Sequence, residues 1–508
     1  MYGSIPSAMV VGAEGHAVTV EVQVSKGLPG FHLVGRPDTS IREARDRARA
    51  AVLSSGLSWP SAYITVNLAP AGDRKAGSAL DLAIAVGLLV AADVVPRDAV
   101  AGLAFVGELG LDGSIRSVPG VVPMVAALGA LDVVVPVGSA VEARVAALGT
   151  VRPVADLAEL VAALLALEPW PDHDVGVDCG HDEPAPLPDL ADVHGQPLGR
   201  HALEIAAAGG HHTLFVGPPG SGKTMLAARL PGLLPPLDRT QSLEATMIHS
   251  AAGVVLPPGG LVRTPPFRAP HHTSSRVALI GGGSSSLRPG EISMAHCGVL
   301  FMDELAEFAP SVLDGLRQPL EQHVVTVDRS RLHVTIPADF LLVAAMNPCP
   351  CGGGAPGQCV CGDAVLHRYA RRVSGPLLDR FDLRVNVHRP GVDDLLANEP
   401  GEPSGVVAAR VAAARALALD RQQCLNSSLA AARLDEHARL DPAATQQLRD
   451  EMENGRLTGR GYHRVRRVAR TIADLRGDRS DTVSDGDVTM ALRFRATLAA
   501  ALQTGRAA

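Results

Sequence analysis

Short runs of apolar residues, some alternating with polar ones, recur through the first third of the chain and predict β-strands. The strand-like runs occupy residues 18–24, 63–68, 103–107 and 133–136. Between them, two segments have the spacing of helices, residues 41–55 and 80–91. This order of strands and helices predicts an α/β domain over residues 1–165.

Two segments rich in proline, glycine and acidic residues interrupt the periodic pattern and divide the rest of the chain. Residues 166–189 and residues 391–405 are both predicted to be linkers. Between them, residues 190–390 contain several buried strand-like runs and form a second predicted domain. Residues 406–508 are rich in Ala, Leu, Arg and Gln at helical spacing, which predicts an all-helical third domain.

A glycine-rich loop in the second domain carries the clearest chemical signal. It follows a short apolar strand, residues 213–216, and precedes a helix start at residues 225–230. The loop fits the phosphate-binding pattern G-x-x-x-x-G-K-[S/T] and consists of Gly217, Pro218, Pro219, Gly220, Ser221, Gly222, Lys223 and Thr224. Glycines let backbone N–H groups face phosphate oxygens, and the helix start adds positive dipole. Lys223 is therefore predicted to reach the β/γ-phosphates of ATP, and Thr224 to ligate Mg²⁺.

A second apolar run ends in two acidic residues, which is a Walker B arrangement. Residues 299–302 form the apolar part, followed by Asp303 and Glu304. Asp303 is predicted to hold the Mg²⁺ shell and Glu304 to polarise the attacking water. A third run, residues 341–346, ends at Asn347, which we expect to sense the γ-phosphate or the lytic water.

Residues 374–382 predict a capped helix start that carries an exposed arginine, Arg380. An arginine in this place can act as a finger on the ATP of a neighbouring subunit. The alternative is a surface salt bridge with Asp379 or Asp382.

Composition narrows the class of protein further. Hydrophobic residues make up 46% of the 508 residues, enough for buried cores, but aromatic residues only 3%, which disfavours a base-stacking surface. The net charge of −7 disfavours nucleic-acid binding by the whole molecule and leaves local basic patches as candidates. Residues 1–20 lack a basic segment followed by an apolar core, and the uncharged apolar stretches are too short to cross a membrane. We therefore expect a cytoplasmic protein with no membrane partner.

Strings spread over nearly the whole chain resemble the YifB/ComM family of magnesium-chelatase-like AAA+ ATPases. They are residues 27–31 (GLPGF), 34–38 (VGRPD), 67–71 (NLAPA), 75–81 (KAGSALD), 266–272 (PFRAPHH), 289–293 (PGEIS), 316–321 (LRQPLE) and 460–464 (RGYHR). The resemblance implies a Lon-protease-like α/β amino-terminal domain, a P-loop AAA+ core with a parallel sheet, and a helical carboxyl-terminal lid. It also implies a homo-hexameric ring with ATP at the subunit interfaces, Arg380 as the finger in trans and Arg460 as the second sensor from the lid. In the related ComM proteins the implied activity is DNA-dependent ATP hydrolysis, with helicase action in branch migration during recombination.

A Lon-like domain raises the alternative of proteolysis, which needs a serine nucleophile and a lysine base. Ser78 lies near the place of the serine in this resemblance. The segment that resembles the lysine-bearing stretch, residues 118–123, contains no lysine, and Lys75 is too close in sequence to be assumed a substitute. We therefore expect this domain to be structural or to engage DNA.

Four of the seven cysteines lie in one short loop: Cys349, Cys351, Cys359 and Cys361. Four thiolates can bind Zn²⁺ tetrahedrally, and His367 is a possible extra ligand. The C-x-C spacing is tighter than the usual C-x₂-C spacing, so a reduced unligated loop and a redox pair stay open as alternatives.

Three arginines are candidates for contacting DNA. Residues 322–336 predict a β-hairpin, at the place where related ring motors carry a pore hairpin, and Arg329 and Arg331 lie at its tip. Arg268 lies in the insert between the two Walker motifs and is the third candidate. Residues 456–479 carry eight arginines and two aspartates, a net charge of +6, which suits either a salt-sensitive phosphate-binding helix or a solvated lid face.

Together these features predict an ATP-hydrolysing ring motor that uses ATP and Mg²⁺ and acts on DNA. A chelatase-type motor that remodels a protein or metal-insertion partner is the alternative, and a Lon-like peptidase is a third reading. DNA stimulation of ATP hydrolysis would separate the first two.

Overall fold

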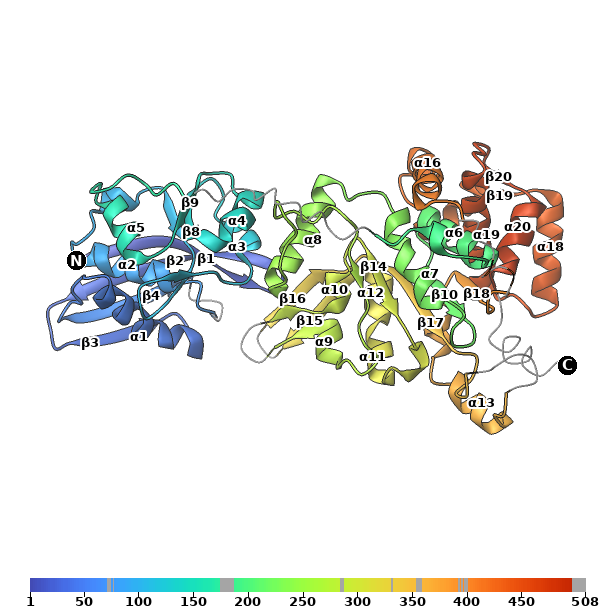
Figure 1. Ribbon diagram of the computed structural model, residues 1–508, viewed down its shortest axis with the longest axis horizontal. Coiled ribbons are helices and arrows are strands. Elements are labelled where there is room, and N and C mark those ends of the chain that lie inside the picture. Colours follow the sequence, from blue (N-terminus) through green and yellow to red (C-terminus); the bar gives the residue numbers. More distant parts are fainter. Residues whose placement is uncertain are drawn as a thin grey trace.

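The computed structural model is an α/β multidomain structure, as the sequence predicts. It describes residues 1–70, 75, 77–173, 187–283, 287–329, 332–352, 359–391, 393, 396 and 401–495. Three parts follow one another along its longest axis, an amino-terminal α/β part, a central α/β part and a mostly helical part (Figure 1). Among the described residues, none of the helices has the length and apolar character that a bilayer crossing requires.

The amino-terminal part contains two sheets of three or more strands and a short antiparallel pair, β6 (Glu108–Leu109) with β7 (Ile115–Arg116). The larger is a mixed sheet in the order β1 (Tyr2–Val11), β2 (Glu14–Ser25), β4 (Tyr63–Ala69) and β3 (Gly30–Val34). The smaller is parallel and contains β5 (Leu103–Phe105), β8 (Asp132–Pro136) and β9 (Val151–Val154). The helices are α1 (Thr39–Ser54), α2 (Asp81–Ala91), α3 (Val121–Ala127), α4 (Ala140–Ala146) and α5 (Leu157–Leu164). Alternate residues of β2 and β4 are buried, which explains why their sequences alternate.

A five-stranded parallel sheet forms the centre of the molecule. Its order is β11 (Phe267–Arg268), β14 (Val299–Met302), β17 (Leu341–Met346), β10 (Thr213–Val216) and β18 (Leu383–Asn386). Every residue of β10, β14 and β17 is buried, because these are inner strands with apolar clusters on both faces. This explains why the sequence shows them as continuous apolar runs.

Helices and a hairpin surround this sheet. The helices before β11 are α6 (Pro197–Gly209), α7 (Lys223–Arg229) and α8 (Arg239–Ala252). The helices after it are α9 (Arg276–Ile280), α10 (Glu291–Met294), α11 (Pro310–Gly315), α12 (Arg317–Gln322), α13 (Asp363–Ala370) and α14 (Gly375–Leu378). The predicted hairpin is present as β15 (Val324–Arg329) and β16 (Leu332–Pro337). Ser374 occupies the N-cap position of α14, but its hydroxyl accepts a hydrogen bond from Arg317 and does not cap the helix.

The carboxyl-terminal part contains α16 (Ser404–Gln422), α18 (Pro442–Glu453), α19 (Gly459–Leu475) and α20 (Asp485–Arg493). The sequence predicted an all-helical domain, but this part also contains two short strands. β19 (Arg439–Leu440) pairs in parallel with β20 (Thr482–Val483). Val411 of α16 and Val468 of α19 share one buried cluster with Leu226 of α7. The helical part is therefore packed against the central sheet and its helices.

The amino-terminal part contacts the central part through the turn between β1 and β2. Ala13 of this turn is buried in a cluster with Ile248 of α8 and with Val334 and Ile336 of β16. A Cβ atom added at Gly12, where φ is +65°, would lie 2.5 Å from Val334 Cγ1. The close fit explains the glycine and places the first domain directly on the predicted pore hairpin.

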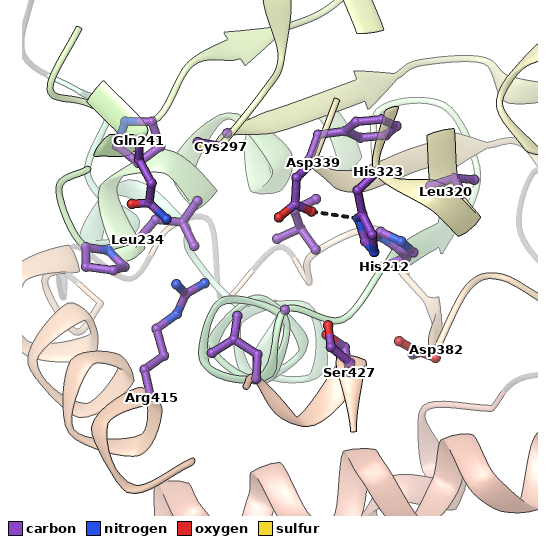
Figure 2. A pocket seen from close by; sticks show the side chains of 18 of the residues that line it. His212, Leu234, Gln241, Cys297, Leu320, His323, Asp339, Asp382, Arg415 and Ser427 are labelled. Atoms are coloured by element: carbon purple, nitrogen blue, oxygen red, sulfur yellow. Dashed lines mark ion pairs between the residues drawn. The ribbon is translucent and has the colours of Figure 1, made fainter. Parts of the chain in front are cut away.

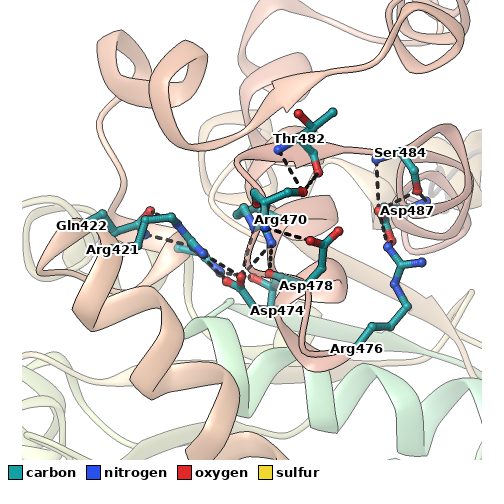
Figure 3. A network of polar contacts seen from close by, with 12 residues as sticks. Arg421, Gln422, Arg470, Asp474, Arg476, Asp478, Thr482, Ser484 and Asp487 are labelled. Atoms are coloured by element: carbon teal, nitrogen blue, oxygen red, sulfur yellow. Dashed lines mark hydrogen bonds and ion pairs between the residues drawn. The ribbon is translucent and has the colours of Figure 1, made fainter.

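A buried polar network ties the helical part together (Figure 3). Arg470 and Asp474 of α19 have fully buried side chains, with Arg470 Nε 3.0 Å from Asp474 Oδ1. Arg421 of α16 donates to both oxygens of the same carboxylate, at 2.8 and 2.9 Å. Asn426 adds a further hydrogen bond of 2.7 Å. The arginines of residues 456–479 therefore do not form one solvated face, since some of them neutralise buried acids.

Replacing Asp474 by alanine is expected to destabilise the protein by about 3–5 kcal/mol, because two arginines would keep their buried charges without a counterion. The measurement is the first urea-unfolding transition of the full-length chain. Asp481→Ala removes an exposed acid from the same part of the chain and is the matched control. Equal stability of both variants would show that the buried network contributes nothing.

Candidate active site

The glycine-rich loop connects β10 to α7 at the carboxyl edge of the parallel sheet. Gly220 and Gly222 have φ values of +74° and +85°, which favour glycine. A Cβ atom added at Gly217 would lie 2.1 Å from the Val387 carbonyl oxygen. Within the described part of the chain, the Ser221 hydroxyl is buried and has no hydrogen-bond partner. A free buried donor inside a backbone turn fits a phosphate ligand.

Lys223 is the first residue of α7, and its side chain is buried beneath the loop. Its Nζ donates to the carbonyl oxygens of Gly217 and Pro218 at 2.8 and 2.9 Å. It also lies 3.3 Å from Asn347 Oδ1, at the end of β17. Burial lowers the pKa of Lys223 from its ordinary value. The lysine and the candidate sensor are thus brought together, although 124 positions separate them in sequence.

Thr224 and Asp303 meet across the ends of α7 and β14. The Thr224 hydroxyl donates to Asp303 Oδ2 at 2.8 Å. A hydroxyl and a carboxylate are hard oxygen ligands of the kind that Mg²⁺ prefers. These two residues therefore fit the Mg²⁺ that accompanies a nucleotide.

Glu304 follows Asp303 in a constrained backbone conformation, with φ of +53°. A non-glycine residue in this region is strained, and such residues cluster at functional sites. His272 Nδ1 lies 3.3 Å from Glu304 Oε2. The candidate base is therefore paired in this structure with a histidine from the segment that follows β11.

Two residues of this edge were not singled out by sequence reasoning for the roles they have here. They are His272, beside Glu304, and Tyr369, beside Asn347. Tyr369 Oη, on α13, donates to the Asn347 carbonyl at 3.2 Å. The order of the strands could have identified His272. Because β11 runs parallel to β14, their carboxyl ends share one edge, and the segment after β11 lies near Glu304.

Arg380 lies at the opposite edge of the sheet. Leu383, at the amino end of β18, is in register with Thr213, at the amino end of β10, and Arg380 precedes Leu383 by three residues. The four residues of β10 span about 13 Å, so Arg380 lies across the sheet from the glycine-rich loop of its own chain. It cannot contact a nucleotide bound there.

The predicted exposure of Arg380 is wrong, and so are the ion-pair partners considered for it. Its side chain is 16% exposed and forms an ion pair with Glu321, and its Nη1 donates to the Pro376 carbonyl at 2.6 Å. Asp382 instead pairs with Arg464 and His211. Burial and the neighbouring arginines lower the pKa of Arg380 from its ordinary value.

Arg460 lies on the same side of the molecule as Arg380. It is the second residue of α19, its side chain is 77% exposed, and its Nη1 is 3.9 Å from Asp379 Oδ2. The helical part thus places Arg460 near Asp379, at the amino edge of the sheet and across it from the glycine-rich loop of its own chain.

A cavity of about 370 Å³ opens at this amino edge, between the sheet and the helical part (Figure 2). Its lining includes Arg380, Arg415, Arg464 and Arg467. Arg415 donates its Nε to the Ala207 carbonyl at 2.7 Å, and burial lowers its pKa to about 10. The acids of the lining are Asp339, paired with His323, and Asp382. Positive charge exceeds negative charge around this cavity.

The three DNA candidates have different surroundings. Arg268 is part of β11 and forms a bidentate pair with Glu291, at 2.6 and 2.8 Å. Arg268 would have to exchange Glu291 for a phosphate oxygen in order to contact DNA. Arg329 ends β15 at the hairpin tip, and Arg331 lies outside the described residues.

Ser78 of the amino-terminal part donates a hydrogen bond to a carboxylate, that of Glu108. Lys75 is buried, and its Nζ donates to the Pro70 carbonyl. The group that Ser78 contacts is thus a carboxylate, whereas Lon-type proteolysis needs a lysine base beside the serine. This arrangement gives the peptidase reading no support.

The four clustered cysteines converge at one point. Cys349 follows β17 closely and Cys361 precedes α13, and the four sulfur atoms lie within 4.8 Å of one another. Cys349 and Cys351 are 3.2 Å apart, Cys349 and Cys359 are 3.5 Å apart, and Cys351 and Cys359 are 3.7 Å apart. His367 lies within α13 and is not part of this cluster.

Three family descriptions match successive parts of the chain. Residues 20–138 match "Subunit ChlI of Mg-chelatase", and residues 189–395 match "Magnesium chelatase, subunit ChlI". Residues 401–495 match "Magnesium chelatase, subunit ChlI C-terminal".

Several known proteins are similar to this chain. The uncharacterized protein YifB of Escherichia coli K12 is 41% identical over 493 residues, which is 96% of this chain and 95% of YifB. Competence protein ComM of Haemophilus influenzae Rd is 38% identical over 491 residues, 96% of each chain. Lon protease 2 of Bacillus subtilis 168 is 30% identical over 187 residues, covering 31% of this chain and 32% of the protease.

Proposed function

We propose that this chain, which belongs to the YifB/ComM family of magnesium-chelatase-like AAA+ ATPases, hydrolyses ATP between neighbouring copies of itself and uses the energy to move DNA. One observation carries the ATPase part of the proposal. Two hydrogen-bonded pairs, Lys223 with Asn347 and Thr224 with Asp303, lie at the edge of the sheet where β10, β14 and β17 end.

Each of these residues has a distinct role in the proposed reaction. The loop N–H groups and Lys223 bind the phosphates of MgATP, and Thr224 and Asp303 hold its Mg²⁺. Glu304 orients the attacking water and accepts its proton, after its carboxylate has left His272. Asn347 contacts the γ-phosphate. Zn²⁺ has no part in this step, and at the four cysteines it would be a structural ion.

The proposed assembly is a homo-hexameric ring: the site is incomplete within one chain and needs a neighbour, and six is the number of copies that the family resemblance implies. Arg380 and Arg460 lie across the sheet from their own glycine-rich loop, so both would act on the ATP of the neighbouring subunit. The arginine-lined cavity beside them gives this face the positive charge that a nucleotide-facing surface needs. In this setting Arg380 must exchange Glu321 for a phosphate oxygen.

DNA is the proposed substrate, and the cytoplasm is the proposed setting. Support comes from the hairpin β15–β16, whose tip carries Arg329, and from the name of the relative ComM, a competence protein. The hairpin packs on the amino-terminal part and follows β14 in sequence, so movement at Glu304 can reach it through the chain.

The ATPase rate is expected to rise with single-stranded or forked DNA, and the rise should fade between about 50 and 200 mM salt. Arg329→Ala should weaken DNA binding and reduce the salt slope by about one. Arg493→Ala removes an exposed arginine of α20 and is the matched control, and Glu304→Gln is the blank for hydrolysis.

A motor that acts on a protein or metal-insertion partner is the second candidate, favoured by the chelatase descriptions that match three parts of the chain. Steady hydrolysis that is indifferent to DNA at both salt concentrations would select it and reject the DNA proposal.

A further inference from the structure

We propose that Cys349, Cys351, Cys359 and Cys361 bind one structural Zn²⁺, and that this ion holds the Asn347 end of β17 against the phosphate-binding loop. The first part is independent of the proposed function. The second part rests on it, because Asn347 matters only if the chain hydrolyses ATP.

The sulfur separations fit a tetrahedral thiolate site. A Zn–S bond of about 2.3 Å corresponds to sulfur separations of about 3.8 Å in a tetrahedron. The three separations at Cys349, Cys351 and Cys359 are 3.2, 3.5 and 3.7 Å, and Cys361 completes a group within 4.8 Å. Thiolate ligands select soft or borderline ions such as Zn²⁺ over Mg²⁺. The site is therefore distinct in chemistry from the nucleotide site.

The geometry favours the metal over the two alternatives. A disulfide requires a sulfur separation of about 2.05 Å, and none of these four cysteines forms one. A loop with no ligand would have no reason to bring four polar sulfur atoms together, two from each side of the loop. Convergence from both sides is what a shared ion produces.

The described residues contain a second group of possible metal ligands, which does not form a metal site. Glu244, His296 and Cys297 also lie close together. His296 Nδ1 accepts a hydrogen bond of 3.0 Å from the Asp339 N–H, so its Nε2 carries the proton of the neutral ring and donates to Glu244 at 3.1 Å. Neither ring nitrogen is free to ligate a metal. The cysteine cluster differs, because its four ligand atoms gather around one another.

Contacts on both sides connect the cysteine loop to the nucleotide site. Cys349 is two residues beyond Asn347, and Tyr369 of α13 donates to the Asn347 carbonyl at 3.2 Å. A Cβ atom added at Gly352, where φ is +89°, would lie 3.0 Å from Pro219 Cγ. A metal that joins the end of β17 to the start of α13 therefore fixes the segment that carries Asn347 and supports the loop at Pro219.

The test begins with the metal content of the full-length protein purified without chelators. About one Zn²⁺ per chain is expected, and Cys359→Ser and Cys361→Ser should each lower the occupancy severalfold. Cys424→Ser changes a cysteine outside the cluster and should keep the ion. Co²⁺ exchanged into the wild-type protein should give the charge-transfer and d–d absorption of tetrahedral thiolate coordination, which tests the site even if a variant fails to fold.

Wild-type protein without metal, with all four thiols reactive or with two of them lost to a disulfide, would overturn the site. For the second part, chelation should lower kcat for ATP by about tenfold, and Zn²⁺ should restore it. Unchanged kcat in metal-free protein would overturn the link to Asn347. If the zinc-loaded wild type does not hydrolyse ATP at all, the proposed function fails while the metal site stands.

Discussion

Replacing Lys223 by alanine is expected to abolish ATP binding, and with it all hydrolysis. The Lys223 ammonium is the buried cation of the phosphate-binding loop, and it is held by the Gly217 and Pro218 carbonyls in a position to receive phosphate oxygens. Charge-assisted hydrogen bonds are the strong ones, and losing such a donor costs about 10²–10³ in rate or affinity. Titration of a fluorescent ATP analogue measures the binding directly.

Glu304→Gln is expected to lose hydrolysis but not ATP binding, unlike Lys223→Ala. Glutamine keeps the size and polarity of the side chain but cannot accept the proton of water, so binding should persist while kcat falls by about 10²–10⁴. Lys26→Ala is the matched control for Lys223→Ala, because Lys26 is an exposed lysine of the amino-terminal part. Wild-type affinity in Lys223→Ala would show that the glycine-rich loop is not the ATP site.

Local pattern was sufficient to predict the parts of this site that lie on buried strands. The runs before Gly217, Asp303 and Asn347 coincide with β10, β14 and β17, because an inner parallel strand is apolar on both faces and ends where polar residues begin. Strand ends of one parallel sheet share an edge, so the residues after them converge without further information.

Charged partners could not be predicted in the same way. Arg380 pairs with Glu321, 59 positions away, and Arg268 pairs with Glu291 from another element. Charge patterns along a helix also hide burial, since Arg470 belongs to a basic segment yet is fully buried against Asp474. The pairs of Arg380 and Arg268 and the burial of Arg470 depend on how elements pack, and the sequence of each element carries almost no record of that packing.

The contact between the first domain and the hairpin could not be predicted from the sequence either. Gly12 marks a turn in the sequence, but nothing local indicates that Val334 of the hairpin will lie against it. The hairpin is predicted from its own sequence, but of β1 and β2 only residues 18–24 are predicted as a strand. The contact between the β1–β2 turn and the hairpin exists only because two domains meet, and it gives the Lon-like part a physical role next to the proposed pore.

Arg380→Ala is expected to lower kcat for ATP by about 10³ while leaving ATP affinity close to that of the wild type. The arginine lies across the sheet from its own glycine-rich loop, so its loss removes a charge that stabilises the transition state at the neighbouring site. Glu321→Gln serves as the control, because it removes the resting partner of Arg380 but keeps the finger. It should leave kcat high.

Mixed rings separate a finger in trans from a structural role. A site built from an Arg380→Ala chain and a neighbouring Lys223→Ala chain has an intact lysine and an intact arginine. Equal random mixing of the two inactive variants should therefore restore about one site in four. Mixing either variant with itself restores none. Recovered hydrolysis in the mixture requires that Lys223 and Arg380 of different chains share one ATP, whereas an inactive mixture of well-formed rings would place the finger elsewhere.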